Sequence, residues 1–137
     1  MLDTTTERGA HVEQRLRDNI VTWLVTVRPD GRPHAVPVWF AWDGAHIWVF
    51  SQPGSQKLRN IRQNPHVLLA LDETHEGDED EVVTVEGTAE LLADASITSL
   101  PAYVEKYVQE MSDIGLTPAT MAQSYSQPIR ITPTRFR

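Results

Sequence analysis

Residues 33–51 read PHAVPVWFAWDGAHIWVFS, and this stretch decides the expected fold. Apolar residues alternate with others along 33–42 and again along 46–51, which is the period of two that is typical of β-strands. Asp43-Gly44 lies between the two runs, and this dipeptide is the strongest short signal for a tight hairpin turn. Because proline cannot donate a hydrogen bond within a sheet, Pro37 places the first strand at an edge, a bulge or a break.

The same alternation recurs on both sides of this hairpin. Six strands are predicted in all, at 20–27, 33–42, 46–51, 66–72, 82–93 and 127–137. Helical spacing of apolar residues predicts four helices, at 12–20, 55–64, 100–111 and 118–125. Strands that follow one another through tight turns form an antiparallel meander, and closure into a barrel is the usual way to remove its exposed edges. We therefore expect a mainly β fold, a barrel with flanking helices.

Length and composition narrow the class of protein. The 137 residues suffice for one domain, expected over 11–137 after a flexible polar leader at 1–10. The net charge of −7 argues against general binding of nucleic acid, and no apolar run approaches the length that spans a membrane. There is no cysteine, and the five histidines lack the spacing of metal ligands, so we expect no thiol chemistry and no metal. The chain is expected to be soluble and cytoplasmic, and the nearly all acidic or polar stretch 73–81 is expected to be a solvated loop.

Two neighbouring segments are candidates for binding a ligand. At 36–39 the proline-containing strand has backbone groups free to meet a planar hydrogen-bonding ring, and the alternative is an edge strand whose proline resists aggregation. At 51–60 a strand and a glycine turn lead into a helix with Ser55 and Lys57 at its start, where the helix dipole favours an anion. A plain serine cap beside a solvated basic face is the alternative. Together the segments suit a ligand with a ring and a phosphate, such as a flavin mononucleotide.

At this point the sequence resembles a known family, the pyridoxamine-phosphate-oxidase-like split barrels. The resemblance is closest to their branch of coenzyme F420-dependent reductases, the flavin/deazaflavin oxidoreductases of type B. The matching segments cover most of the chain in the same order, and they are 23–27, 30–33, 36–40, 51–61, 64–65, 86–90 and 128–135. The resemblance implies a six-stranded antiparallel split β-barrel of the FMN-binding type. It also implies a homodimer with two sites at the interface.

The resemblance further implies which residues bind the cofactor. The backbone of Val36, Pro37, Val38 and Trp39 is expected to contact its ring. The side chains expected to hold its phosphate are Ser51, Ser55, Gln56 and Lys57. Arg59 and Arg130 are then expected to meet the acidic polyglutamate tail of F420.

The expected activity is hydride transfer between the deazaflavin ring of F420 and a small organic acceptor. Where the FMN oxidases carry an Arg-Lys pair, this chain has Gln56-Lys57, and that difference favours F420 over FMN. No acid or base is required of the protein, because the cofactor supplies the chemistry. Tyr103 and Tyr107 are candidates for the substrate side, although their helical spacing also fits ordinary packing. The alternatives are an FMN-dependent oxidoreductase or flavin reductase, a non-catalytic carrier of F420 or flavin, and a barrel without a redox cofactor.

Overall fold

The computed structural model describes residues 2–71 and 82–137, so the expected loop at 73–81 lies outside the described residues. The strands are β1 (Val21–Val27), β2 (Pro33–Trp39), β3 (Ala41–Trp42), β4 (Ile47–Ser51), β5 (His66–Leu71), β6 (Val83–Leu91) and β7 (Gln127–Phe136). The helices are α1 (Glu7–Asp18), α2 (Gln56–Gln63), the 3₁₀ turn η2 (Ile97–Ser99), α3 (Pro101–Asp113) and α4 (Pro118–Ser124). None of the helices in the described ranges is long and apolar enough to cross a membrane.

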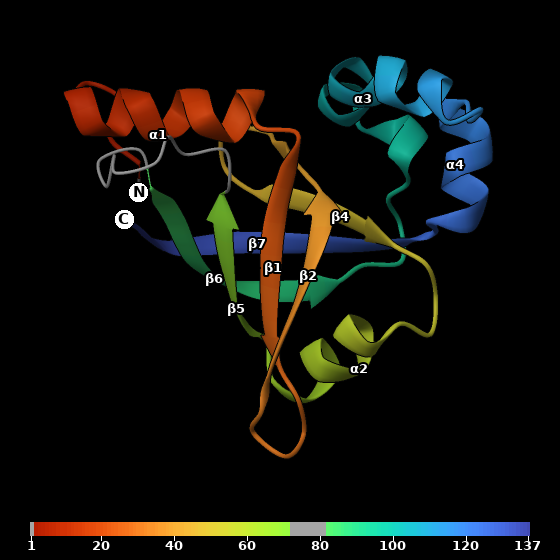
Figure 1. The fold of residues 1–137 in the computed structure, drawn as a ribbon, viewed down its shortest axis with the longest axis horizontal. Helices are drawn as coiled ribbons and strands as arrows, with labels where there is room; N and C mark the ends of the chain where they lie inside the picture. Colours follow the sequence, from red (N-terminus) through yellow and green to blue (C-terminus); the bar gives the residue numbers. More distant parts are fainter. Residues whose placement is uncertain (1, 72–81) are drawn as a thin grey trace.

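All seven strands form one antiparallel sheet in the order β2-β1-β5-β6-β7-β4-β3. The two outermost strands, β2 and β3, are separated in the chain by Phe40 alone. The sheet therefore has to curl until its two ends meet, which gives the strongly curved half-barrel of Figure 1. The prediction of a mainly β split barrel with flanking helices is confirmed.

The number of strands was predicted wrongly, because the expected strand at 33–42 is divided at Phe40 into β2 and β3. The backbone N–H of Phe40 donates to the hydroxyl of Tyr107 at 2.8 Å. Its carbonyl oxygen accepts from the ammonium of Lys106 at 2.9 Å. Two side chains of α3 thus satisfy backbone groups that a neighbouring strand would otherwise bond. The sheet has seven strands instead of six for this reason.

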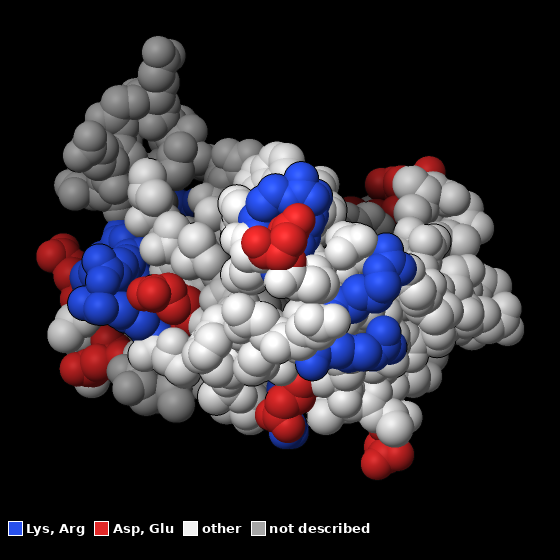
Figure 2. All heavy atoms as spheres, turned by 90° about the horizontal axis from the view of Figure 1, so that it is seen from below, with Lys and Arg blue, Asp and Glu red and all other residues white. Residues whose placement is uncertain are grey.

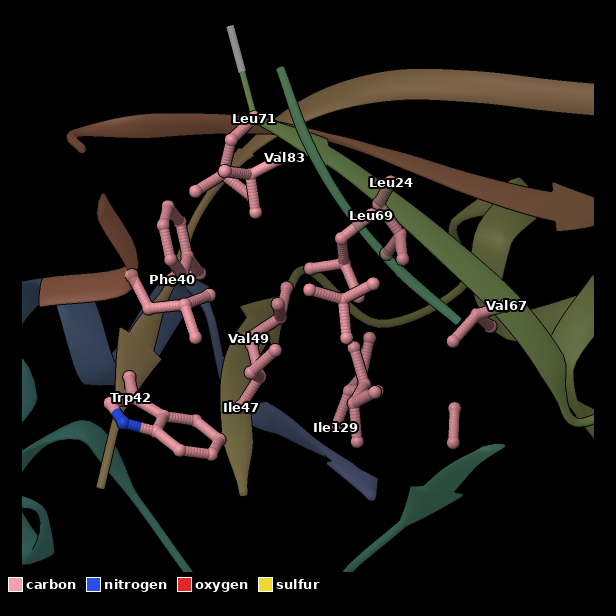
Figure 3. Close-up of a cluster of buried hydrophobic side chains, with 14 of the residues drawn as sticks. Leu24, Phe40, Trp42, Ile47, Val49, Val67, Leu69, Leu71, Val83 and Ile129 are labelled. Atoms are coloured by element: carbon pink, nitrogen blue, oxygen red, sulfur yellow. The ribbon is translucent and has the colours of Figure 1, made fainter. Parts of the chain in front are cut away.

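One hydrophobic core fills the interior of the barrel. Figure 3 shows side chains of several strands that point toward one another, among them Leu24, Ile47, Val49, Leu69 and Ile129, all of them fully buried. Helix α1 closes one end of the barrel and α2 the other, each with its apolar stripe turned inward. Helix α1 begins at Glu7, within the segment expected to be a leader, because the Thr6 side chain accepts a hydrogen bond from an N–H of its first turn.

A second core lies on the outer surface of β3 and β4. It holds α3 and α4 against the barrel, and its buried members are Ala41, Trp48, Phe50, Ile97, Tyr103, Tyr107, Met111 and Met121. The expected helices at 100–111 and 118–125 therefore form a separate layer beside the barrel. This layer faces the β2 edge and supplies the second wall of the site described next.

Candidate functional site

A cavity of about 370 Å³ lies between the barrel and the α3–α4 layer. Its wall is formed by Val21, Pro37, Val38, Trp39, Phe50, Lys57, Tyr103, Ile114, Leu116, Met121 and Tyr125. Among these described residues Lys57 is the one charged side chain, and the others are aliphatic, aromatic or methionine. The volume falls in the range of small-molecule sites, which combine apolar walls with a few polar groups.

The barrel side of the cavity is the edge strand β2. Among the described strands β2 pairs with β1 alone, and Pro37 lies opposite Trp23 in that pairing. Pro37 was expected at an edge, a bulge or a break, and the structure has it on an edge strand. Three of the four residues expected to contact a ring, Pro37, Val38 and Trp39, line the cavity. Val36 pairs with the fully buried Leu24 and lies outside the cavity wall.

Lys57 brings the only formal charge to the wall formed by the described residues. Its side chain is partly buried, and its ammonium makes no hydrogen bond or ion pair with any residue that the structure describes. Burial lowers the pKa of Lys57 from its ordinary value. Because an ammonium loses hydration on burial, an unpaired one favours an anionic partner. The cavity is therefore suited to a largely apolar ligand with one anionic group.

The serines expected to hold a phosphate bond to each other. The hydroxyls of Ser51 and Ser55 are 2.9 Å apart, and the Ser51 hydroxyl also donates to the carbonyl of Gln52. Ser55 occupies the N-cap position of α2, yet in the described part of the chain its side chain does not bond an N–H of the helix. The first-turn N–H groups of α2 are thus left without a serine cap, next to Lys57.

Gln56 and Arg59 belong to a network that anchors α2 to the barrel. Arg59 donates to the carbonyl of Gly54 at 2.6 Å and to the side-chain oxygen of Gln56 at 2.7 Å. Gln56 donates to Asn60 at 2.8 Å, and the fully buried Asn60 donates to the hydroxyl of Thr26 on β1 at 2.9 Å. Both hydrogen-bonding ends of the Gln56 amide are therefore occupied. Sequence reasoning missed Asn60, whose only signal was a polar residue beside the buried stripe of α2.

Basic side chains gather below the cavity. Figure 2 shows Lys and Arg on the underside of the molecule, where α2 and the turn between β1 and β2 lie. Arg59 and Arg62 are exposed on α2, and Arg28 and Arg32 flank a shallow groove at the turn that Gln56 also lines. Arg32 is paired with Asp30 at 2.8 Å. An exposed basic surface persists here in spite of the acidic total, and it suits an extended anion.

His34 lies beside this basic surface and was missed by sequence reasoning. It is a partly buried residue of β2, and its Nδ1 atom is buried without a hydrogen-bond partner among the described residues. Burial lowers the pKa of His34, and the charges of Arg28 and Lys57 lower it further. Positive potential at the lower end of the cavity thus arises from two separate elements, the β1–β2 turn and α2.

Arg130 lies apart from the other predicted site residues. It belongs to β7 and forms an ion pair with Glu90 on β6 at 3.1 Å, in a directly opposed cross-strand position. It is outside the cavity wall. The fold brings Lys57 and Arg59 together on one helix and leaves Arg130 with its charge already balanced.

The two candidate tyrosines have different surroundings. Tyr107 stacks on Trp39 with the ring centroids 4.7 Å apart and the planes at 5°, and its hydroxyl donates to the carbonyl of Ile20 at 2.6 Å. Tyr103 lines the cavity, and its ring packs edge-on against Phe50 at 4.9 Å. Burial raises the pKa of Tyr103, and the neighbouring Tyr125 adds a smaller contribution. Tyr107 thus supports the wall from behind, whereas Tyr103 is part of it.

Comparison with known proteins agrees with this architecture. The family model described as pyridoxamine 5'-phosphate oxidase matches residues 9–137. No curated protein matches. A solved F420 reductase is similar at 28% identity and a TM-score of 0.68, covering 91% of this chain and 94% of its own. An FAD-binding protein from Mesorhizobium loti is 27% identical with a TM-score of 0.65, and the match covers 93% of this chain and 88% of that one. A haem storage protein from Vibrio cholerae, 16% identical with a TM-score of 0.66 over 93% and 92% of the two chains, shares the fold.

Proposed function

Because this chain belongs to the pyridoxamine 5'-phosphate oxidase family, we propose that it is an F420H2-dependent reductase that transfers hydride to a small organic acceptor. Solved relatives with this fold include an F420 reductase and an FAD-binding protein. A cofactor of the flavin or deazaflavin type is what these two relatives have in common. The observation that carries the proposal is the partly buried ammonium of Lys57, unpaired among the described residues, at one end of an apolar cavity beside an edge strand.

The cavity fits such a cofactor in two parts. Pro37, Val38 and Trp39 would hold the flat ring against the edge of β2, where apolar contacts and free backbone groups are both available. Lys57 and the uncapped N–H groups of α2 would hold the phosphate. Ser51 and Ser55, which already bond to each other, would support this end of the site by fixing the start of α2.

The charge of the phosphate group favours F420 over FMN. The monoester phosphate of FMN carries about −1.5 to −2 charges at neutral pH, whereas the diester phosphate of F420 carries a single charge. The described wall presents one cation, Lys57, while the amide of Gln56 is engaged by Asn60 and Arg59. One ammonium neutralises a diester more completely than it neutralises a monoester.

The basic surface next to the cavity suits the acidic tail of F420. Arg59 and Arg62 on α2, with Arg28 at the β1–β2 turn, are placed to meet a chain of carboxylates that leaves the phosphate. Arg130 is not part of this proposal, because Glu90 already balances its charge. Exposed cations of this kind contribute more to the rate of encounter than to affinity, and their effect falls as salt is added.

When it is bound, the deazaflavin ring supplies the hydride at its C5 carbon. The chain contributes the remaining conditions for reaction. Trp39, held flat by Tyr107, fixes the plane of the β2 wall. Leu116 and Met121 of the α3–α4 layer form the apolar wall that excludes water and accommodates the acceptor. Binding, orientation and exclusion of water are the tasks that proteins perform for redox cofactors in general.

The outer face of the sheet supports the further proposal that the protein is a homodimer. Trp23 is 40% exposed on this face, and Val21, Val25, Leu68 and Ala70 are its partly buried neighbours on β1 and β5. A contiguous apolar face of this kind on a sheet is typical of an interface, and a second copy covers it with identical apolar side chains. Because Val21 also lines the cavity, this interface would run to the mouth of the site.

Titration of the cofactor-free protein with F420 and with FMN, followed by fluorescence, tests the proposed function. We expect tighter binding of F420, followed by oxidation of F420H2 when a quinone or an enone is added. Preference for FMN would replace the proposal by a flavin-dependent oxidoreductase of the same fold. Tight binding of F420 without turnover of any acceptor would identify a carrier, and binding of neither cofactor would refute both.

A further inference from the structure

One hydroxyl in the cavity wall has no hydrogen-bond partner among the described residues. Tyr103 is 1% exposed and lines the cavity, and its hydroxyl makes no hydrogen bond with any residue in the described ranges. By contrast, the hydroxyl of the equally buried Tyr107 contacts backbone atoms of Ile20 and Phe40. The Tyr103 hydroxyl is not among the buried polar atoms that lack a partner in the described ranges, so it remains accessible from the cavity that the residue lines.

The ring of Tyr103 is held in place by other aromatic rings. Phe50 packs against it edge-on at 4.9 Å and 81°, and Tyr107 packs at 4.9 Å and 43°. These contacts prevent the side chain from turning toward bulk water. The ring therefore stays in the cavity wall, and its hydroxyl, which makes no hydrogen bond with the described residues, is available to a bound molecule.

The protonation state of Tyr103 determines what it can bind. Burial raises the pKa of this phenol, so it remains neutral and keeps its proton throughout the ordinary pH range. It can act as a hydrogen-bond donor and is poorly suited to give up the proton. Among its neighbours in the cavity wall, Leu116 and Met121 are apolar, and the phenol of Tyr125 is near but makes no hydrogen bond with Tyr103. A neutral molecule with an acceptor oxygen matches this environment.

From these observations we infer that the Tyr103 hydroxyl donates a hydrogen bond to a carbonyl oxygen of a flat conjugated molecule in the cavity, and so determines specificity for carbonyl-bearing acceptors. This inference deepens the proposed function and rests on it for the identity of the reaction. Two molecules offer this chemistry, the acceptor and the cofactor ring, and the experiment separates them. Tyr103 polarises the carbonyl of the acceptor, which favours arrival of a hydride at the conjugated carbon.

The test compares Tyr103→Phe with Tyr107→Phe, since each removes one buried hydroxyl and keeps the ring. For Tyr103→Phe we expect kcat/KM with menadione as acceptor to fall about 2- to 13-fold, the value of one neutral hydrogen bond, with no loss of melting temperature. Tyr107→Phe serves as the control for stability, and we expect it to lower the melting temperature because its hydroxyl bonds backbone atoms of Ile20 and Phe40. If the F420 dissociation constant rises by the same factor in Tyr103→Phe, the partner is the carbonyl of the cofactor ring.

Two results would overturn the inference. One is a Tyr103→Phe variant in which both kcat/KM and cofactor affinity equal those of the wild type. The other is an equal fall in melting temperature in both variants, which would point to a general effect on packing. Menadione binding to the cofactor-free wild type and to Tyr103→Phe, measured by calorimetry, keeps the test independent of the proposed function. A wild type that binds neither F420 nor FMN refutes the function, whereas affinities for menadione and for F420 that are both unchanged in the variant refute the role of Tyr103.

Discussion

Lys57→Met isolates the charge in the cavity from its packing. Methionine has an unbranched side chain of similar length, so it can fill the same space between the apolar residues of the wall. The substitution removes the one cation that the described wall presents to a ligand. We expect it to weaken the binding of F420 and of FMN while leaving the barrel folded.

The size of the effect on binding follows from the kind of interaction lost. A hydrogen bond to a charged group contributes about 1.5–3 kcal/mol. Since about 1.4 kcal/mol corresponds to a tenfold change in a dissociation constant, Lys57→Met is expected to weaken cofactor binding about 10- to 100-fold. The expected loss lies at the upper end of this range because Lys57 has no partner among the described residues that could compete with the ligand.

Lys57→Met is expected to weaken cofactor binding but not to lower the stability of the cofactor-free protein. Burial lowers the pKa of Lys57 in the folded protein below its ordinary value in the unfolded chain. Between these two pKa values the unfolded chain binds the proton more readily than the folded protein, so the free energy of unfolding rises with pH across that window. Below the window Lys57 is charged in both states, and the folded protein bears the full cost of burying the ammonium. At pH 7 the methionine variant has no ammonium to bury and so does not bear this desolvation cost. Its melting temperature without cofactor is expected to equal or exceed that of the wild type, and to increase less when F420 is added.

Fluorescence titration and thermal denaturation measure the two effects, with Arg62→Met as the matched control. Arg62 is an exposed residue of the same helix and loses the same charge, but it does not line the cavity. The control should change the dissociation constant by less than about threefold, as expected for a screened surface charge. Equal losses of affinity in both variants, or an unchanged affinity in Lys57→Met, would refute a direct contact between Lys57 and the ligand.

Three further predictions concern other parts of the molecule. Trp23→Lys should convert a dimer into a monomer in sedimentation equilibrium, because it buries a charge in the proposed interface; a wild type that is itself monomeric contradicts the interface. His34→Gln should flatten the rise in melting temperature that the wild type shows as pH approaches about 6.5 from below, since the lowered pKa of His34 makes the folded protein gain stability as pH rises toward the pKa of the unfolded chain; parallel pH profiles of the two proteins argue against it. Asn60→Leu should lower the free energy of unfolding by about 1–3 kcal/mol in urea titrations, because it leaves the buried hydroxyl of Thr26 without its donor; an unchanged midpoint would show that the network adds nothing.

The sequence by itself determined the features that depend on neighbouring residues. Alternation on both sides of Asp43-Gly44 predicted the hairpin, and the structure has β3 and β4 paired across it. Thr117 followed by Pro118 predicted the start of α4, and the Thr117 side chain accepts from an N–H of its first turn. Pro37 lacks an N–H and therefore predicted an edge, a bulge or a break, and β2 is an edge strand. Such features are local, because backbone geometry and capping are decided within a few residues.

Tertiary structure decided which of these elements meet. The break between β2 and β3 at Phe40 depends on the hydroxyl of Tyr107, 67 residues further along the chain, and the sequence around Phe40 does not predict it. Arg130 and Lys57 are both cations in the sequence, yet Glu90 neutralises one, while the other lies unpaired among the described residues in an apolar wall. Tyr103 and Tyr107 lie on one helix face, and their hydroxyls differ only in what each reaches. The charge state and hydrogen-bonding capacity of a side chain depend on its partners in space, and those are fixed only when the barrel closes and α3–α4 packs against it.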